Sequence, residues 1–214
     1  MKILFEDDCI IVCIKPVGIQ SQRESTGRES MITLLSAHCG SEVYPLHRLD
    51  RDVGGVMVYA KTKAAAAFLS RDIAEHKLKK EYIALVHGAP NPEKGEMRDL
   101  LFKDSRKNKS FVVDRIRKGV KEALLEYETL CVRDGMAAVK VLLHTGRTHQ
   151  IRVQFASRKM PLAGDRKYGG RDDFEEIGLF SFRLTLNHPK TGEELIFTAK
   201  PENIIKDYVL EETL

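Results

Sequence analysis

Residues 44–62 read YPLHRLDRDVGGVMVYAKT, and the fold expected for the chain follows from this stretch. Its second half, 55–62, is rich in β-branched and aromatic residues and predicts a strand. Strong helix formers fill 63–80, and Thr62 is a suitable N-cap, so a helix is expected next. The first half places two arginines and two aspartates within 48–52, which suits either a solvated turn or an active loop.

Outward from this stretch, the chain alternates short strands with irregularly spaced helices. Strands are expected at 3–5, 9–16, 81–88, 122–134, 136–145, 179–186 and 194–200, with a turn at Asp134-Gly135 that pairs 122–134 with 136–145. Helices are expected at 29–40, with Gly40 as C-cap, at 148–158, with Thr148 as N-cap, and in a short segment after Pro201. A hairpin or irregular insertion is expected at 98–121. This order predicts an α+β fold with a mixed, largely antiparallel β-sheet flanked by helices. No linker is evident, so 1–214 is expected to form a single domain.

The composition is that of a globular protein, with 43% hydrophobic and 31% charged residues among 214. No run approaches the roughly 18 apolar residues that a membrane span requires. Acidic residues also interrupt the apolar N-terminus, so we expect a cytoplasmic protein that does not enter a membrane, with a monomer as the default. The four cysteines include no CxxC pair, which favours reduced thiols over a disulfide or a metal site.

Charge is unevenly distributed along the chain. Residues 98–121 hold nine Lys/Arg against three Asp, a net of +6, and 140–171 hold eight against Asp165 alone, a net of +7. Residues 172–214 instead carry ten acidic against four basic residues, a net of −6. This asymmetry suggests a face that binds a polyanion, although ordinary solvated surface would also account for it.

Several cofactor and metal motifs are absent from the sequence. It contains no GxGxxG or GxxxxGK[ST] loop, so no nucleotide cofactor is expected to be held in those ways. His144 and His149 are five residues apart, which does not match a zinc-binding helix, and no HExxH occurs, so no metal is expected. No GxSxG motif points to acyl transfer.

Three residues are candidates for chemistry. Asp50, flanked by Arg48 and Arg51, should stay ionised and could be a nucleophile, a general base or a metal ligand, or only a member of a structural ion pair. Tyr82 would share a strand face with apolar residues, so it belongs either to the core or to a base-stacking surface. Arg152 follows a strand–turn–helix junction together with Arg147, where anions bind readily, but both could be solvated helix charges.

Five pieces together resemble the RluA-type family of RNA pseudouridine synthases. They are ILFEDDCIIVCIKPVGIQSQ, HRLDRDVGGVMVYAKT, KKEYIALVHG, TGRTHQIRVQF and AGDRKYGG (163–170), in the family's order over roughly residues 3–200. The resemblance implies the family's catalytic fold, an RNA substrate (ribosomal or transfer RNA) and isomerisation of uridine to pseudouridine without a cofactor. It also implies that the chain begins at the catalytic domain, without the small N-terminal RNA-binding domain of many relatives.

The resemblance also assigns roles to residues. Asp50 matches the family's catalytic aspartate, Tyr82 the tyrosine that packs against the target uracil, and Arg152 the arginine that pairs with the aspartate. Arg48 matches the arginine that fills the gap left by a flipped base, and Ile151 matches the aliphatic neighbour of Arg152. We add His47, Arg51 and Arg147 as further candidates for substrate contact.

An ionised Asp50 suits three first steps, namely attack on the sugar, addition to the base or abstraction of a sugar proton. Two other functions fit the sequence less well. A non-catalytic RNA-binding protein has no need of Asp50, and a metal-dependent phosphoesterase is disfavoured by the arginines around Asp50 and Asp52. The chain departs from the family at Val53-Gly54-Gly55, where Thr-Ser-Gly is usual and the added glycine is expected to loosen the loop, and at Gln154, where histidine is frequent.

Overall fold

The computed structural model describes residues 1–23 and 29–209, which form two compact units. Unit 1 consists of Met1–Lys80 and Ser181–Ala199, and unit 2 of Glu81–Phe180 and the chain from Lys200 onward. The first two boundaries fall inside strands β5 (Lys79–His87) and β10 (Leu179–Asn187). This position explains why no shift in composition marks them in the sequence.

Unit 1 is built on strands that pair mostly in antiparallel fashion, and all of them except the short β3 were predicted. They are β1 (Lys2–Glu6), β2 (Ile10–Lys15), β3 (Tyr44–Pro45), β4 (Gly54–Ala60), β10 and β11 (Glu194–Thr198), in the order β1-β2-β4-β10, with β3 paired to β4 and β11 to β10. The register of β2 against β4 runs from Ile10 opposite Ala60 to Lys15 opposite Gly55. The end of β2 therefore lies beside the residues that enter β4.

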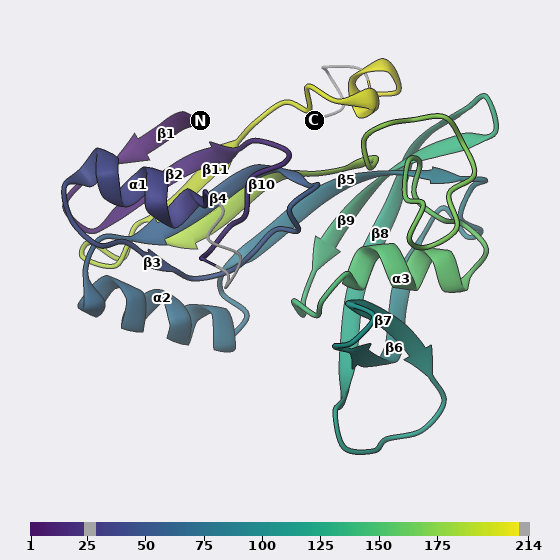
Figure 1. Cartoon of the computed structure of the whole chain (residues 1–214), viewed down its shortest axis with the longest axis horizontal. Coiled ribbons are helices and arrows are strands. Elements are labelled where there is room, and N and C mark those ends of the chain that lie inside the picture. Colours follow the sequence, from purple (N-terminus) through teal and green to yellow (C-terminus); the bar gives the residue numbers. More distant parts are fainter. Residues whose placement is uncertain (24–28, 210–214) are drawn as a thin grey trace. The chain divides into compact units, whose positions relative to one another are not determined.

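Two helices cover the sheet of unit 1 on opposite faces (Figure 1). Helix α1 (Met31–Cys39) begins with the Ser30 hydroxyl accepting from Thr33 N–H and ends at Gly40 in the left-handed conformation, as predicted. Helix α2 (Lys63–Ala74) is capped by Thr62, also as predicted.

Helix α2 ends six residues earlier than expected. Residues 75–77 are exposed and offer no apolar side chain to continue the buried face, whereas Leu78 is buried in the core. A left-handed turn at His76 (φ 58°) brings Leu78 into that core, and the chain then enters β5.

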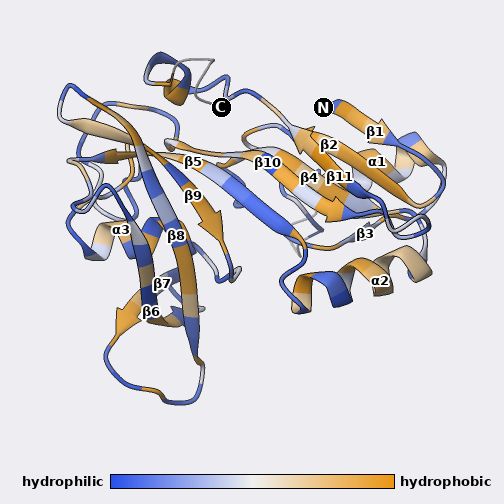
Figure 2. Cartoon of the chain, turned by 180° about the vertical axis from the view of Figure 1, so that it is seen from behind, coloured by the Kyte–Doolittle hydropathy of each residue, from blue (hydrophilic) through white to orange (hydrophobic). Residues whose placement is uncertain are grey.

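The core between α2 and the sheet consists of alternate residues of the central strands together with Leu69 of α2 and Leu78. Its buried members are Ile10, Val12, Val56, Val58, Leu69, Leu78, Leu184 and Leu186. Figure 2 shows β2, β4 and β10 as hydrophobic over most of their length, because helices cover both of their faces.

Unit 2 is a second antiparallel arrangement in the order β5-β9-β8-β6-β7. Its further elements are β6 (Lys94–Asp104), β7 (Lys109–Val113), β8 (Val120–Arg133), β9 (Met136–Leu143), α3 (Gln150–Ser157) and the 3-10 helix η1 (Ile204–Asp207). Asp134 (φ 54°) and Gly135 (φ 74°) form the predicted tight turn between β8 and β9. The insertion at 98–121 is a β6–β7 hairpin followed by a loop that leads to β8.

The start of α3 differs from the prediction. The helix begins at Gln150, because His149 adopts the left-handed conformation (φ 53°, ψ 29°). The N-cap predicted at Thr148 is therefore wrong. The Thr148 carbonyl oxygen instead accepts a hydrogen bond from the Ser110 hydroxyl at 2.6 Å.

Two simpler expectations can be compared with the structure. All four cysteines are unpaired thiols, in agreement with the prediction of reduced cysteines. Within 1–23 and 29–209, none of the helices combines the length and hydropathy needed to cross a membrane. The α+β class with a largely antiparallel sheet is confirmed.

Candidate active site

The loop that carries Asp50 connects β3 to β4 in unit 1. Its tight turn is closed by Val53 N–H, which donates to the Asp50 carbonyl oxygen at 3.1 Å, and the Val53 side chain is buried. Asp50 itself is half-buried, and Arg48 is exposed. Arg51 Nε donates to Asp52 Oδ1 at 3.0 Å on the surface, where such a pair contributes little to stability.

Lys15, at the end of β2, binds the backbone of this loop through its ammonium group. Its side chain is fully buried, and Nζ donates to the carbonyl oxygens of Pro16 (2.9 Å), Ile19 (2.7 Å) and Arg51 (3.1 Å). Burial lowers the pKa of Lys15 to about 8, and the carboxylates of Asp52 and Asp50 partly oppose this shift. Lys15 therefore joins the turn after β2 to the Asp50 loop.

His47, three residues before Asp50, joins the loop to β4 by a hydrogen bond. Its Nε2 accepts from Val58 N–H at 3.3 Å, so in the neutral ring the proton is on Nδ1, a buried atom without a partner among the described residues. Burial lowers the pKa of His47 to about 3, and the charge of Lys80 acts in the same direction. His47 is thus a neutral member of the loop.

The glycines after the loop belong to β4, and they do not loosen it as expected. Gly54 and Gly55 are buried strand residues. Gly55 has φ 129°, and a Cβ atom there would lie 2.3 Å from the Ser181 carbonyl oxygen of β10. The absence of a side chain thus permits close packing of two strands directly after the Asp50 loop.

In unit 2, Tyr82 lies on β5 opposite Val141 of β9 and is only 5% exposed. Ile151 on α3 is buried as well. Arg147 precedes the helix, and its Nε donates to the Glu122 carbonyl oxygen of β8 at 2.8 Å. Their roles in substrate binding stay predictions, as do those of Arg48, His47 and Arg51.

Helix α3 is unusual because its first six residues, polar and apolar alike, are buried. Gln150 accepts from Thr145 Oγ1 and Arg147 N–H, and Gln154 donates to Asp99 Oδ2 at 2.7 Å. Arg152 forms a bidentate pair with Asp165, with Nε to Oδ2 at 2.7 Å and Nη2 to Oδ1 at 2.9 Å. Charge-assisted bonds of this kind fix the direction of the guanidinium group.

Both basic segments of the sequence lie in unit 2, and they adjoin each other. Lys109 Nζ donates to the Lys167 carbonyl oxygen at 2.6 Å, and Lys167 Nζ donates to that of Asn108 at 3.1 Å. We call their exposed cations the basic surface of unit 2: Arg98, Lys103, Arg106, Lys107, Arg115, Arg117, Lys118, Lys121, Arg158, Lys159, Arg166, Lys167 and Arg171.

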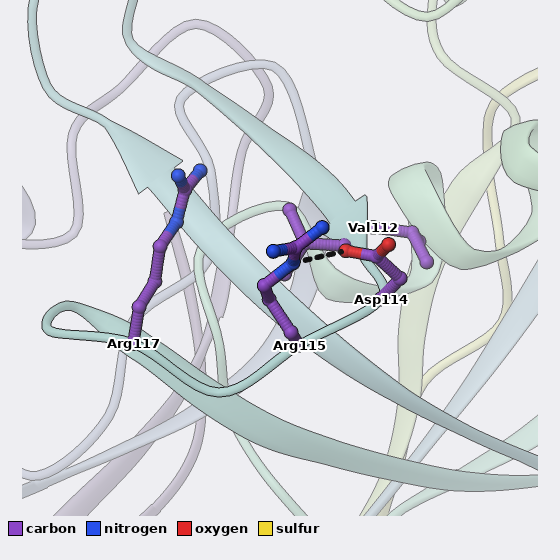
Figure 3. Close-up of a pocket in the computed structure, with 5 residues that line it drawn as sticks. Val112, Asp114, Arg115 and Arg117 are labelled. Carbon is purple, nitrogen blue, oxygen red and sulfur yellow. Dashed lines mark ion pairs between the residues drawn. The ribbon is translucent and has the colours of Figure 1, made fainter.

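The loop after β7 carries part of this basic surface. A shallow pocket there is lined by Val112, Val113, Asp114, Arg115 and Arg117. Figure 3 shows the guanidinium groups of Arg115 and Arg117 extending from the same loop. Arg115 Nε lies 3.5 Å from Asp114 Oδ1. Arg117 packs over the ring of Phe102, at 5.1 Å from its centroid.

A group of potential metal ligands occurs in unit 1, at Asp7, Cys9 and His188. His188 Nδ1 accepts from Thr191 N–H at 3.1 Å, and Nε2 lies 2.7 Å from Asp7 Oδ2. The neutral ring therefore carries its proton on Nε2 and donates it to Asp7. These contacts join the β10–β11 turn to Asp7 by hydrogen bonds.

Sequence reasoning missed three residues that support the candidate site: Lys15, Asp165 and Tyr168. Lys15 could have been found as a lysine that ends an apolar strand directly before proline. Asp165 could have been found as the lone acid in a segment of eight basic residues. Tyr168 packs beside Arg152, whose Cζ is 5.2 Å from the ring centroid, and no pattern in the sequence indicated that contact.

Comparison with known proteins identifies the family of the chain. A model of the RNA pseudouridylate synthase family matches residues 9–157, which include Asp50, Tyr82 and Arg152. The chain is 34% identical over 228 residues to an uncharacterised RNA pseudouridine synthase of Aquifex aeolicus, covering 96% of this chain and 71% of that protein. It is 31% identical over 216 residues to the ribosomal large subunit pseudouridine synthase C of Buchnera aphidicola, covering 95% of this chain and 68% of that protein.

The fold also matches a solved structure, human RNA pseudouridylate synthase domain containing 4, with a TM-score of 0.76 and 23% identity over 94% of this chain and 89% of that one. This likeness concerns the fold, whereas the family is shown by the match to its family profile and by the sequence relatives. The loop of Asp50 and the helix of Arg152 are thus parts of a known kind of enzyme. The chain belongs to the RNA pseudouridine synthases, and within them to the RluA-type family.

Proposed function

We propose that this enzyme converts specific uridines of structured RNA to pseudouridine with Asp50 as the catalytic carboxylate. In this reaction the bond between N1 of uracil and C1′ of ribose breaks, the base turns, and C5 bonds to C1′. C5 loses its proton and N1 gains one, so the product is an isomer of the substrate. The reaction needs no redox partner, and a positioned carboxylate supplies a nucleophile or base.

The observation that carries the proposal is the hydrogen bonding of the Asp50 loop to the buried Lys15 ammonium group. A solvated turn would not need a buried ammonium, yet Lys15 donates to the Arg51 carbonyl oxygen at 3.1 Å, at the residue directly after Asp50. The same ammonium binds the turn after β2, so the loop is tied to the end of a central strand. Fixed loops of this kind keep catalytic groups in the productive geometry.

The other candidate residues fit distinct tasks. The target uridine must leave its stack, at a cost of a few kcal/mol, and the exposed Arg48 would fill the gap it leaves. Tyr82 would bound the flipped base. Arg152, held through Nε and Nη2 by Asp165, would keep Asp50 ionised and oriented.

The basic surface of unit 2 would bind the phosphate backbone of RNA. Its cations come from two segments that meet at Lys109 and Lys167, so one continuous stretch of RNA can contact both. Among ribosomal and transfer RNA, ribosomal RNA is favoured, because relatives are named ribosomal large subunit pseudouridine synthases C and D.

Mapping pseudouridine in total RNA tests the proposal in cells. Three strains would be compared with the parent: a deletion of this gene, the deletion carrying Asp50→Asn, and the deletion carrying Asp52→Asn as a matched control from the same loop. We expect one or a few ribosomal sites to disappear in the first two strains and to return in the third. An unchanged map in the deletion would contradict the substrate class, and restoration by Asp50→Asn would contradict the role of Asp50.

A further inference from the structure

Tyr168 lies in the loop that follows α3, and its ring and hydroxyl contact different parts of unit 2. The side chain is 9% exposed. Arg152 Cζ lies 5.2 Å and Lys109 Nζ 4.9 Å from the centroid of the ring. The hydroxyl oxygen accepts from Ser110 N–H at 2.8 Å and lies 2.9 Å from His149 Nδ1.

The ring belongs to the support of Arg152. Asp165 binds two nitrogens of Arg152 and also accepts from Tyr168 N–H, at 3.3 Å to Oδ1. One turn thus supplies both the carboxylate that binds the guanidinium group and the aromatic ring beside it. A cation against an aromatic face is stabilised further when both are shielded from water.

This turn has little freedom to move. A Cβ atom on Gly164 would lie 1.9 Å from the Glu176 carbonyl oxygen, and one on Gly170 would lie 2.9 Å from Asp165 N. Gly170 N–H also donates to the Asp165 carbonyl oxygen at 2.9 Å. The turn therefore presents Asp165 and Tyr168 to Arg152 in one geometry.

The hydroxyl of Tyr168 connects this turn to the β6–β7 hairpin. Ser110 is the second residue of β7, and its N–H points to Tyr168, while its hydroxyl binds the Thr148 carbonyl oxygen. The neighbouring residue Lys109 binds the Lys167 carbonyl oxygen. The beginning of β7 is thus joined both to the turn and to the residues that lead into α3.

His149 shows that the junction is held tightly. The left-handed conformation is unfavourable for a non-glycine residue, and it persists where the surrounding structure determines it. His149 adopts this conformation (φ 53°) directly before α3, and its Nδ1 lies at hydrogen-bond distance from the Tyr168 hydroxyl. Tyr168 therefore contacts Arg152, the entry to α3 and the hairpin at once.

We propose that Tyr168 is a positioning residue that holds Arg152 in its working orientation and links that orientation to the β6–β7 hairpin. The inference rests on the proposed function, because Arg152 must act in the reaction for its position to matter. RNA phosphates that bind the hairpin would then stabilise the strand that Tyr168 binds through Ser110. Tyr168 would thus connect substrate binding at the hairpin to the position of Arg152.

Separate variants test the ring and the hydroxyl. Tyr168→Phe keeps the ring beside Arg152 and removes the hydroxyl, whereas Tyr168→Leu removes both. The assay follows tritium released from C5 of uridine in unmodified large-subunit ribosomal RNA, in a single turnover at saturating protein. Tyr127→Leu is the matched control, because the Tyr127 ring packs edge-on against Phe155 of the same helix at 6.1 Å.

We expect Tyr168→Leu to slow the single-turnover rate by at least about tenfold, because small displacements of a catalytic group have effects of this size. The dissociation constant for RNA should change by less than about threefold, because the basic side chains that bind phosphate are all retained. Tyr168→Phe should lie between wild type and Tyr168→Leu, with faster amide exchange at Ser110. Tyr127→Leu should lower the thermal midpoint and leave the rate unchanged.

Opposite outcomes separate this inference from the proposed function. If Arg152→Lys keeps the wild-type rate, the proposed role of Arg152 fails. If Arg152→Lys is slow but folded Tyr168→Leu reacts like wild type, the positioning role alone is overturned. If Tyr168→Phe matches wild type in both rate and Ser110 exchange, the link to the hairpin is overturned.

Discussion

The ammonium of Lys15 donates a hydrogen bond to the carbonyl oxygen of Arg51, at 3.1 Å and across 36 residues of sequence. Two further carbonyl oxygens, from Pro16 and Ile19, accept from the same nitrogen. All three donors of the ammonium group are thus used inside the protein. The Asp50 loop is therefore held by a buried cation that the loop itself does not contain.

Lys15→Met tests this support. The substitution keeps most of the apolar stem and leaves three carbonyl oxygens without their donor, at about 1–3 kcal/mol for each group that stays buried. We expect the rate of pseudouridine formation to fall by at least about tenfold, with RNA affinity within about threefold of wild type. Lys61→Met is the control, since Lys61 pairs with Glu6 near the surface and should leave the rate unchanged. A wild-type rate in folded Lys15→Met would show that the loop does not need this support.

Gly55→Ala tests the packing of β4 on β10. The new Cβ atom would meet the Ser181 carbonyl oxygen at 2.3 Å in a backbone conformation unfavourable for alanine. We expect a loss of about 2–5 kcal/mol in the free energy of unfolding, from strain and overpacking together. Gly40→Ala, at the end of α1 where no atom lies within 4 Å of the new Cβ, should cost only about 1–2 kcal/mol. Denaturation in urea measures both, and equal losses would contradict the close approach.

The half-buried His47, whose Nδ1 atom is fully buried, predicts an acid-sensitive stability. The pKa of His47 is about 3 in the folded protein, against 6.5 for a solvated histidine. Between these two values the unfolded chain therefore binds a proton at His47 that the folded chain does not bind. The free energy of unfolding should fall as the pH drops from 6.5 towards 3, with a contribution of up to about 1.4 kcal/mol per pH unit. His47→Gln keeps an acceptor for Val58 N–H and should show a smaller slope in urea titrations over this range. Equal slopes for the two proteins would exclude this role of His47.

The basic surface of unit 2 predicts a salt-dependent affinity for RNA. Replacing Arg115 and Arg117 together by glutamine removes two exposed cations from the loop after β7. We expect weaker binding, and a slope of log K against log salt that is smaller by about 1.4–1.8, the value for two phosphate contacts. The single-turnover rate at saturating protein should not change. Lys190→Gln, on the β10–β11 turn of unit 1, is the control, and an equal effect there would contradict the assignment of this surface.

Local patterns were sufficient to predict much of the fold. Alternating apolar residues predicted β8 and β9, and Asp134-Gly135 predicted their turn, because neighbours in sequence determine both features. Caps at Thr62 and Gly40 were predicted for the same reason. The end of α2 was not, because burial of Leu78 in the core overrides the helix propensity of residues 75–80.

The support of the candidate site could not be predicted from local patterns. Ser110 and Tyr168 are 58 residues apart, and the hydrogen bond between them depends on how a hairpin and a loop fold against α3. In the sequence, Gly55 suggested a flexible loop. In the structure, the Ser181 backbone lies so close to Gly55 that no side chain fits there. Residue types indicated the chemistry of Asp50 and Arg152, whereas the contacts that hold the Asp50 loop and the Arg152 side chain became visible only in three dimensions.

The most direct test of the central claim is the rate at which purified Asp50→Asn forms pseudouridine in unmodified large-subunit ribosomal RNA. The substitution keeps the size of the side chain and removes its ability to act as a carboxylate. We predict no detectable product with Asp50→Asn and wild-type product with Asp52→Asn, with RNA affinity and thermal midpoint close to wild type for both. Formation of pseudouridine by Asp50→Asn at the wild-type rate would contradict the assignment of Asp50 as the catalytic residue.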